Sequence, residues 1–300
     1  MSPQVPDRRP PALRRCWLFL PGADRAALTS AGAYGADVLI QELEDFTPPE
    51  LLPQARANAI DILPRWRAAG CVAAVRINPL ETEGRRDLAA VMHGHPDIVL
   101  MSKVAEPEQV ASLEEEVTRL ENVVGIAAGS TELGPNIESA RGILRAYAIA
   151  TASRRVTAVL GSTEDLAADL GAPRSKAGIE LGYARQRLHL ECTAAKVLSV
   201  DCPYTFSDLE GCEADARTAR QLGYVAKSAV DPKHVFAINR VMTPSLSEVS
   251  EARGIIEAFE AARRRGEERG RRGDLLIEVP TYLSAKRLIA RAAALGVDGA

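Results

Sequence analysis

The sequence predicts an α/β fold, namely a (β/α)8 or TIM barrel followed by a C-terminal helical extension. Eight short apolar segments rich in Val, Ile and Leu alternate with segments of helical spacing, and such repetition indicates a parallel sheet. The length of 300 residues suits one barrel of about 250 residues with an appendage. The GxGxxG turn typical of a doubly wound sheet does not follow the first segment, so an open sheet with one strand miscounted is the less favoured alternative.

The predicted strands follow one another at intervals that leave room for a helix between them. Several lack polar alternation, as strands buried on both faces should. The intervening segments, such as EPEQVASLEEEVTRLE at 106–121, carry Ala, Leu, Glu and Arg at helical spacing. The predicted strands cover residues 16–20, 37–43, 72–78, 97–103, 133–139, 156–161, 196–201 and 224–230.

The two ends of the chain differ from this repeating part, which we expect to form the barrel over residues 14–243. Residues 1–13 are rich in Pro and Arg and lack an apolar run, which predicts a disordered leader rather than a secretory signal. Residues 244–300 predict a long helix, a break rich in Gly and Arg, a short strand and a final helix. This extension is expected to be a lid or an oligomerisation arm.

Composition and charge limit the classes of partner. The formal net charge of -3 gives no overall attraction to nucleic acid or to an anionic membrane. No apolar run approaches the roughly 18 residues that a membrane span needs. The five cysteines are odd in number and include no CxxC pair, which favours a reducing compartment over a disulfide framework or a zinc site. We therefore expect a cytoplasmic protein that binds neither nucleic acid nor a membrane.

Charged residues gather at the predicted carboxyl ends of the strands, where a parallel barrel carries its catalytic groups. Glu138 and Asp165 follow two neighbouring strands, so their carboxylates could converge on one point and hold Mg²⁺ together with water and substrate. Alternatively, both acids cap the helices that follow them. Arg76 favours the metal site, because its guanidinium could hold a substrate carboxylate opposite the metal.

Seven motifs in chain order carry a resemblance to a known family. They are RRCWLFLPG, DVLIQELEDFT, VRIN, NIESARGI, GSTEDLAADLG, SVDCPYTFSDLEG and AKSAVDP. The sequence resembles the citrate lyase beta-subunit-like branch of the HpcH/HpaI aldolase superfamily from about residue 14 to the C-terminus. The resemblance implies a TIM barrel and a Mg²⁺-dependent lyase that makes or breaks a carbon-carbon bond. It also implies that Mn²⁺ could substitute and that the protein is a homo-oligomer, a trimer or a hexamer.

The resemblance assigns roles to individual residues. Glu138 in NIESARGI and Asp165 in GSTEDL fall on the family's two metal ligands. Arg76 in VRIN falls on its substrate-binding arginine and is expected to take part in catalysis. Glu138, Lys103 and Arg15 are also expected to contact the substrate.

Further acids complete the expected site. Glu44 and Asp45 in ELED, together with Glu164, are expected behind the metal ligands, bonded to metal-bound waters and to basic groups. Glu278 in LLIEVP corresponds to an acid that family members supply to a neighbouring subunit, with Glu in place of Asp. It is expected to be the catalytic acid.

The expected reaction cleaves a short 3-hydroxyacyl-CoA of the citramalyl-CoA, malyl-CoA or citryl-CoA type into a 2-oxo acid and an acyl-CoA. Ser102 stands where the family has Pro, and Asp231 where it has His, and these departures leave the acyl group open. A metal-dependent aldolase of free 2-oxo-4-hydroxy acids and a non-catalytic binding barrel are the alternatives.

Overall fold

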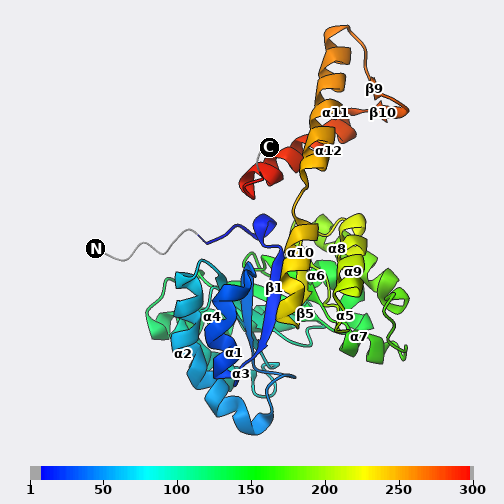
Figure 1. Cartoon of the computed structure of the whole chain (residues 1–300). Coiled ribbons are helices and arrows are strands. Elements are labelled where there is room, and N and C mark those ends of the chain that lie inside the picture. The colour runs from blue at the N-terminus through cyan, green and yellow to red at the C-terminus, as the bar shows by residue number, and fades with distance from the viewer. Residues whose placement is uncertain (1–7, 298–300) are drawn as a thin grey trace. The chain divides into compact units, whose positions relative to one another are not determined.

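The computed structural model describes residues 8–297 (Figure 1). The chain divides after Arg240 into two compact units, Met1–Arg240 and Val241–Ala300. The first unit holds the repeating strands and helices, and the second holds the C-terminal extension. The boundary expected from the sequence was after residue 243.

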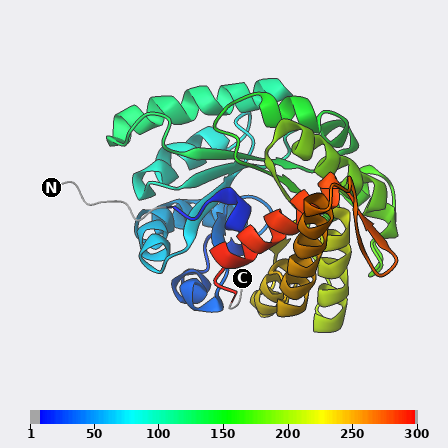
Figure 2. The same cartoon turned by 90° about the horizontal axis from the view of Figure 1, so that it is seen from above.

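The first unit is built on one eight-stranded sheet whose strands neighbour each other in the order β7-β6-β5-β4-β3-β2-β1-β8. Every pairing between these strands is parallel. Figure 2 looks down onto these strands and the helices around them. The predicted TIM barrel is therefore confirmed. The strands are β1 (Cys16–Pro21), β2 (Val38–Glu42), β3 (Val72–Ile77), β4 (Ile98–Met101), β5 (Glu132–Ile137), β6 (Ala158–Gly161), β7 (Leu198–Val200) and β8 (Lys227–Ala229).

The barrel closes between β7 and β8, which stand at the two ends of the strand order. A single parallel bridge joins Asp201 to Lys227. The backbone N–H of Asp201 donates to Ala226 O at 3.0 Å, and that of Ser228 donates to Asp201 O at 2.9 Å. Few backbone bonds hold this closure, which we call the β7–β8 seam, and the buried side chains of Asp201 and Lys227 meet across it at 2.6 Å.

Helices follow the strands as the sequence spacing predicts. The segment predicted at 106–121 begins with a capping box of Glu106 and Gln109, has Pro107 at its first position and ends at Gly125 with φ 76°. Within residues 8–297, no helix is long and apolar enough to cross a membrane. The α-helices of this part are α1 (Arg25–Ser30), α2 (Leu52–Ala68), α3 (Gly84–Val91), α4 (Pro107–Val124), α5 (Ala140–Leu144), α6 (Ala146–Thr151), α7 (Glu164–Asp169), α8 (Gly182–Ala195), α9 (Leu209–Leu222) and α10 (Val235–Met242).

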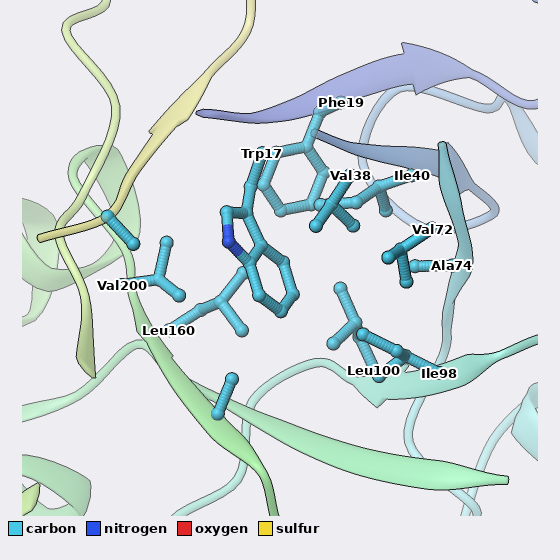
Figure 3. Packing of buried hydrophobic residues seen from close by; sticks show 12 residues of the cluster. Trp17, Phe19, Val38, Ile40, Val72, Ala74, Ile98, Leu100, Leu160 and Val200 are labelled. Atoms are coloured by element: carbon cyan, nitrogen blue, oxygen red, sulfur yellow. The ribbon is translucent and has the colours of Figure 1, made fainter. Parts of the chain in front are cut away.

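An apolar layer of side chains from alternate strand positions fills the barrel interior (Figure 3). Trp17 and Phe19 of β1 point inward, and the rings are buried among aliphatic side chains of the other strands. Because side chains alternate along a strand, Glu42 and Arg76 continue the inward-facing rows of Ile40 and Ala74. The apolar layer thus lies directly below the polar side chains at the carboxyl ends of the strands.

Residues 8–13 differ from the disordered leader expected over 1–13, whose first seven residues lie outside the described part. Pro11–Leu13 form a short 3-10 helix. The Arg8 guanidinium pairs with Glu132 at 3.0 Å and with Asp97 at 3.1 Å, next to the first residues of β5 and β4. These ion pairs fix the segment at the amino ends of the strands, an effect that composition alone does not reveal.

The second unit contains the expected long helix and final helix, α11 (Leu246–Arg264) and α12 (Val279–Ala294). A capping box of Ser245 and Glu248 starts α11. The Gly- and Arg-rich break forms β9 (Gly270–Arg272), which pairs in antiparallel fashion with β10 (Leu275–Ile277). The short strand predicted there is thus half of a hairpin.

Candidate active site

The Arg76 guanidinium lies at the centre of a group of carboxylates at the carboxyl ends of the strands. Its Nε donates to Glu42 Oε1 at 3.0 Å, and its Nη2 lies 2.9 Å from the same oxygen and 3.1 Å from Glu44 Oε2. Its Nη1 lies 3.5 Å from Glu138 Oε1. Burial opposes the charge of Arg76, but the surrounding carboxylates outweigh it and raise its pKa.

Glu138 directly follows β5 and is 4% exposed. The Asn136 side-chain amide donates to its Oε1, while its Oε2 is buried and has no hydrogen-bond partner. Burial raises the pKa of Glu138 to about 7; Arg76 opposes this shift, and Glu44 and Asp165 add to it. A buried carboxylate with one unsatisfied oxygen is costly to fold and is explained by an ion or ligand that completes it.

The structure excludes one of the two roles considered for Glu138, and its role as a metal ligand stays a prediction. Ser139 is the N-cap of α5, and its Oγ accepts from Gly142 N at 3.2 Å, so Glu138 does not cap that helix. Asp165 does lie in the first turn of α7, and its Oδ2 accepts from Ser162 Oγ at 3.0 Å. The capping alternative is therefore wrong for Glu138, whereas a first-turn position and a ligand role are compatible for Asp165.

A cavity of about 460 Å³ opens beside Arg76 and Asp165 and has the size of a small-molecule site. Arg76, Asn136 and Asp165 line one part of it, and an apolar wall lines another. The apolar wall consists of Phe19, Phe46, Pro203 and Val230. The cavity can therefore hold a ligand with one charged end and one apolar face.

The donor set fits a divalent cation that prefers oxygen. Glu138 Oε2 lacks a partner, and the Asp165 carboxylate lies close enough to shift the pKa of Glu138. In residues 8–297, no group of three or more His, Cys, Asp or Glu side chains is arranged to hold a metal ion. Glu138 and Asp165 could supply two carboxylate ligands, the number that Mg²⁺ commonly takes from a protein while water and substrate fill its shell.

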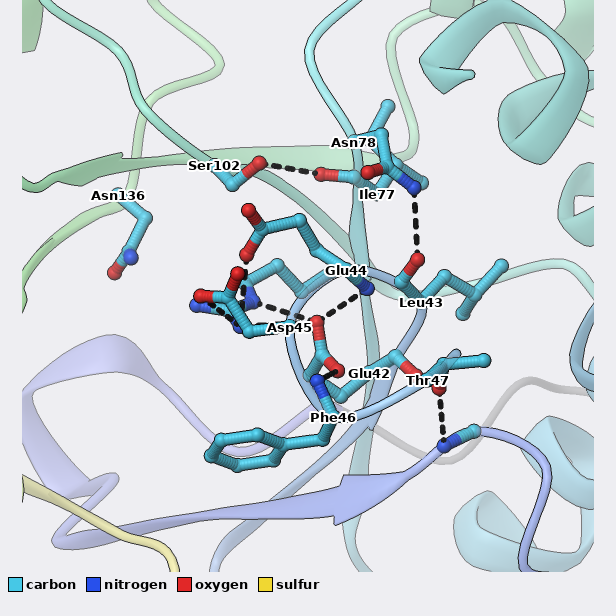
Figure 4. Close-up of polar contacts among 12 residues, drawn as sticks. Glu42, Leu43, Glu44, Asp45, Phe46, Thr47, Ile77, Asn78, Ser102 and Asn136 are labelled. Atoms are coloured by element: carbon cyan, nitrogen blue, oxygen red, sulfur yellow. Dashed lines mark hydrogen bonds and ion pairs between the residues drawn. The ribbon is translucent and has the colours of Figure 1, made fainter. Parts of the chain in front are cut away.

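The loop after β2 brings two further acids to the site (Figure 4). Lys103 Nζ donates to Glu44 Oε1 and lies 3.6 Å from Asp45 Oδ1. The Asn78 side-chain amide donates to Leu43 O at 2.7 Å and so ties this loop to the end of β3. Glu44, Asp45 and Lys103 therefore lie together as expected, although their roles stay predictions.

Glu164 lies on the rim of the same cavity. Its Oε1 accepts from Thr205 Oγ1 at 2.5 Å and from Arg174 Nε at 3.2 Å. These bonds join the start of α7 to the loop after β7. Its expected place behind the metal ligands stays a prediction.

Arg15 is a correction to the sequence-based site. It precedes β1, and its Nε donates to Asp37 Oδ2 at 2.8 Å, just before β2 begins. Both residues therefore lie at the amino ends of the strands, whereas the cavity lies at the carboxyl ends. Arg15 belongs to the motif RRCWLFLPG, which runs along the whole of β1. A residue at the start of this motif therefore lies at the opposite end of the strand from the cavity.

Glu278 lies in the second unit, as the N-cap residue of α12. Its Oε1 pairs with Arg269 Nε at 3.0 Å, and half of its side chain is exposed. Its expected role as an acid in a neighbouring subunit stays a prediction.

Ser102 and Asp231, two of the residues that depart from the family pattern, both have local partners. Ser102 is fully buried, and its hydroxyl donates to Ile77 O at 3.2 Å (Figure 4). Asp231 accepts from Lys233 N at 3.0 Å and pairs with its ammonium at 2.9 Å. Their effect on the substrate stays open.

Two residues of the site were not singled out from the sequence. Neither Glu42 nor Asn136 was assigned a role from the sequence. Period-two counting from Ile40 along β2 would have placed Glu42 inside the barrel. The same counting back from Glu138 would have placed Asn136 beside it.

Comparisons with known proteins agree with this geometry. The sequence pattern described as HpcH/HpaI aldolase/citrate lyase matches residues 15–232. Citrate lyase subunit beta of Escherichia coli strain K12 is 33% identical over 288 residues, covering 95% of each chain. L-malyl-CoA/beta-methylmalyl-CoA lyase of Cereibacter sphaeroides strain ATCC 17025 is 34% identical over 282 residues, covering 86% of this chain and 88% of the relative.

Among solved structures, the CitE protein of Mycobacterium tuberculosis in complex with magnesium, acetoacetate and coenzyme A has a TM-score of 0.77 and 25% identity. That likeness covers 94% of this chain and 99% of the CitE chain. The family resemblance drawn from the motifs is confirmed. The chain belongs to the HpcH/HpaI aldolase/citrate lyase family.

Proposed function

We propose that this protein is a Mg²⁺-dependent carbon-carbon lyase that cleaves a short 3-hydroxyacyl-CoA into a 2-oxo acid and an acyl-CoA. The observation that carries the proposal is the buried carboxylate of Glu138, which has one unsatisfied oxygen beside Asp165 and Arg76. The relatives support it, since they include a citrate lyase subunit and a malyl-CoA lyase, and a structural neighbour carries magnesium and coenzyme A.

Glu138 and Asp165 would hold the cation at the mouth of the barrel. Bound Mg²⁺ would supply Lewis-acid stabilisation of the negative charge that develops on the substrate hydroxyl oxygen. Arg76 Nη1, which makes no hydrogen bond within the described residues, would donate to a carboxylate or enolate oxygen of the substrate. Asn136 would keep Glu138 Oε1 occupied so that Oε2 faces the cation.

The reaction balances as a retro-aldol cleavage. A base takes the proton of the 3-hydroxyl group, the bond between C2 and C3 breaks, and its electron pair becomes an enolate of the thioester. The 2-oxo acid leaves, and an acid returns a proton to C2 of the enolate. We assign this acid to Glu278 of a neighbouring copy in a homo-oligomer, a trimer or a hexamer.

We also place the protein in the cytoplasm, a location supported by its five unpaired cysteines.

A substrate panel tests the proposal. The purified protein is incubated with Mg²⁺ and either citramalyl-CoA, malyl-CoA or citryl-CoA, or with free 2-oxo-4-hydroxy acids, and the released 2-oxo acid is measured. Release from at least one thioester and not from the free acids is expected. Release from the free acids alone would assign the protein to the aldolases, and release from neither would favour a binding barrel.

A further inference from the structure

Both oxygens of the Glu42 carboxylate accept hydrogen bonds, one from Arg76 and both from the backbone of the loop that follows β2. Glu42 is 0% exposed, ends β2 and stands opposite Arg76 in the parallel ladder. Its Oε1 accepts from Arg76 Nε at 3.0 Å and from the backbone N–H of Glu44. Its Oε2 accepts from the backbone N–H of Phe46 at 2.7 Å (Figure 4). One side chain therefore clamps a guanidinium to the loop of residues 43–46.

This clamp decides which N–H group of Arg76 faces the cavity. Arg76 Nε and Nη2 both pair with Glu42, and Nη2 also pairs with Glu44. Nη1 approaches only Glu138 among the described residues, at 3.5 Å and without a hydrogen bond. The Phe46 ring, held through its own backbone by Glu42, lies with its centroid 5.8 Å from the guanidinium carbon of Arg76.

We infer that Glu42 is a positioning residue of the active site, which fixes the Arg76 guanidinium and the 43–46 loop so that Nη1 is presented to a substrate oxygen. The inference rests on the proposed function, because it assumes that Arg76 binds the substrate. A carboxylate is needed at this position, since four lone-pair sites serve one guanidinium and two backbone donors. A glutamine has one acceptor oxygen, so its amide N–H groups would face at least one of these donors.

The chain contains a matched control in Glu121. This glutamate is also 0% exposed, accepts from two backbone N–H groups, those of Gly129 and Thr131, and pairs with Arg155 at 2.6 Å. It lies in the last turn of α4, beside the amino end of β5, and is not part of the cavity. A glutamine at either position therefore removes the same kinds of bond, but only one of the two belongs to the active site.

The experiment compares Glu42→Gln and Glu121→Gln in full-length protein with the thioester that the wild type cleaves best. We expect the KM of Glu42→Gln to rise by about 10- to 100-fold, the usual cost of losing a residue that orients a ligand-binding group. We expect the fall in its kcat to be smaller, because Arg76 binds the carboxylate in the ground state as well. Glu121→Gln should lose comparable stability to urea with an unchanged KM. Glu42→Asp keeps the charge and both acceptor oxygens and should raise KM less than Glu42→Gln does.

Equal KM values for wild type and Glu42→Gln would overturn the inference, as would equal rises in both glutamine variants. Should Glu42→Gln not fold, Glu42→Asp and Glu121→Asp decide the same question, because only Glu42→Asp should raise KM. A second readout needs no turnover: the Nε–H signal of Arg76 in ¹⁵N NMR, assigned through its loss in Arg76→Lys. Glu42→Gln should speed the exchange of this proton with water, and unchanged exchange would contradict the clamp. A wild type that cleaves no thioester would instead refute the proposed function, and the NMR result would still stand.

Discussion

Two clusters of buried charge lie in the barrel unit. In one the cations and carboxylates are equal in number, and in the other the carboxylates are in excess. The seam cluster comprises Arg185, Asp201, Asp215 and Lys227, with two cations and two carboxylates. Arg185 holds Asp201 in a bidentate pair at 2.9 and 2.8 Å, and Lys227 Nζ lies 2.6 Å from Asp201 and 2.5 Å from Asp215. Burial opposes the charge of Lys227, but the two carboxylates outweigh it and raise its pKa.

The active-site cluster comprises Glu42, Glu44, Glu138 and Arg76, so one buried guanidinium stands among three buried carboxyls, and only the half-exposed Lys103 adds a second cation, at Glu44. Here burial is the larger effect for the acids, and it raises the pKa of Glu42 and of Glu138. The seam cluster can stay charged and satisfied in the folded chain alone, whereas the active-site cluster is left with an excess of negative charge. The comparison teaches that an unbalanced buried cluster is suited to bind a cationic ligand, whereas a balanced one is suited to hold two parts of the fold together.

The first prediction removes an acid from the unbalanced cluster. Glu138→Gln should lower kcat/KM by about three orders of magnitude, the upper range for losing one electrostatic contact to the transition state. It should leave the free energy of unfolding of the metal-free protein unchanged or raised, because it removes a carboxylate whose charge is disfavoured mainly by burial. Steady-state kinetics and urea titration in EDTA measure the two effects. A variant with wild-type activity, or one that is strongly destabilised without metal, would place Glu138 in a structural role.

The second prediction removes a cation from the balanced cluster. Lys227→Met should lower the free energy of unfolding by about 3–5 kcal/mol, because Asp201 and Asp215 lose their ammonium partner in the interior. Urea denaturation measures this loss. Lys233→Met, which breaks a half-exposed pair with Asp231, is the control and should change stability little. Similar stability of the two variants would show that the seam cluster does not stabilise the contact between β7 and β8.

The third and smallest effect is on the pH dependence of stability. Burial raises the pKa of Asp215, but Lys227 and Arg185 outweigh burial and lower it below its usual value. A carboxyl with a lowered folded-state pKa stabilises the fold above the unfolded pKa of about 4, and this contribution is lost as the pH falls through the folded value. The unfolding free energy of Asp215→Asn should therefore fall less steeply than that of the wild type between pH 4 and pH 2. Parallel curves from thermal or urea unfolding would contradict this assignment.

Much of the fold and part of the site could be predicted from the sequence. Short apolar segments in the sequence predict the eight strands, and βα repetition permits few ways of ordering them in a sheet. Glu138, Asp165 and Arg76 were singled out because each stands at a strand end inside a motif, and their roles stay predictions. Arg15 was misplaced, because a motif shared along a strand does not say which end of the barrel carries the function.

The sequence by itself determined the barrel, the family and the residue types at the strand ends, because periodicity and order are local properties of the chain. Only the tertiary structure decided which charges meet. Glu42 and Arg76 are 34 positions apart, and their bond depends on the register of two neighbouring strands. The unsatisfied oxygen of Glu138 likewise follows from what packs around it, since Asn136 takes one oxygen and burial withholds water from the other.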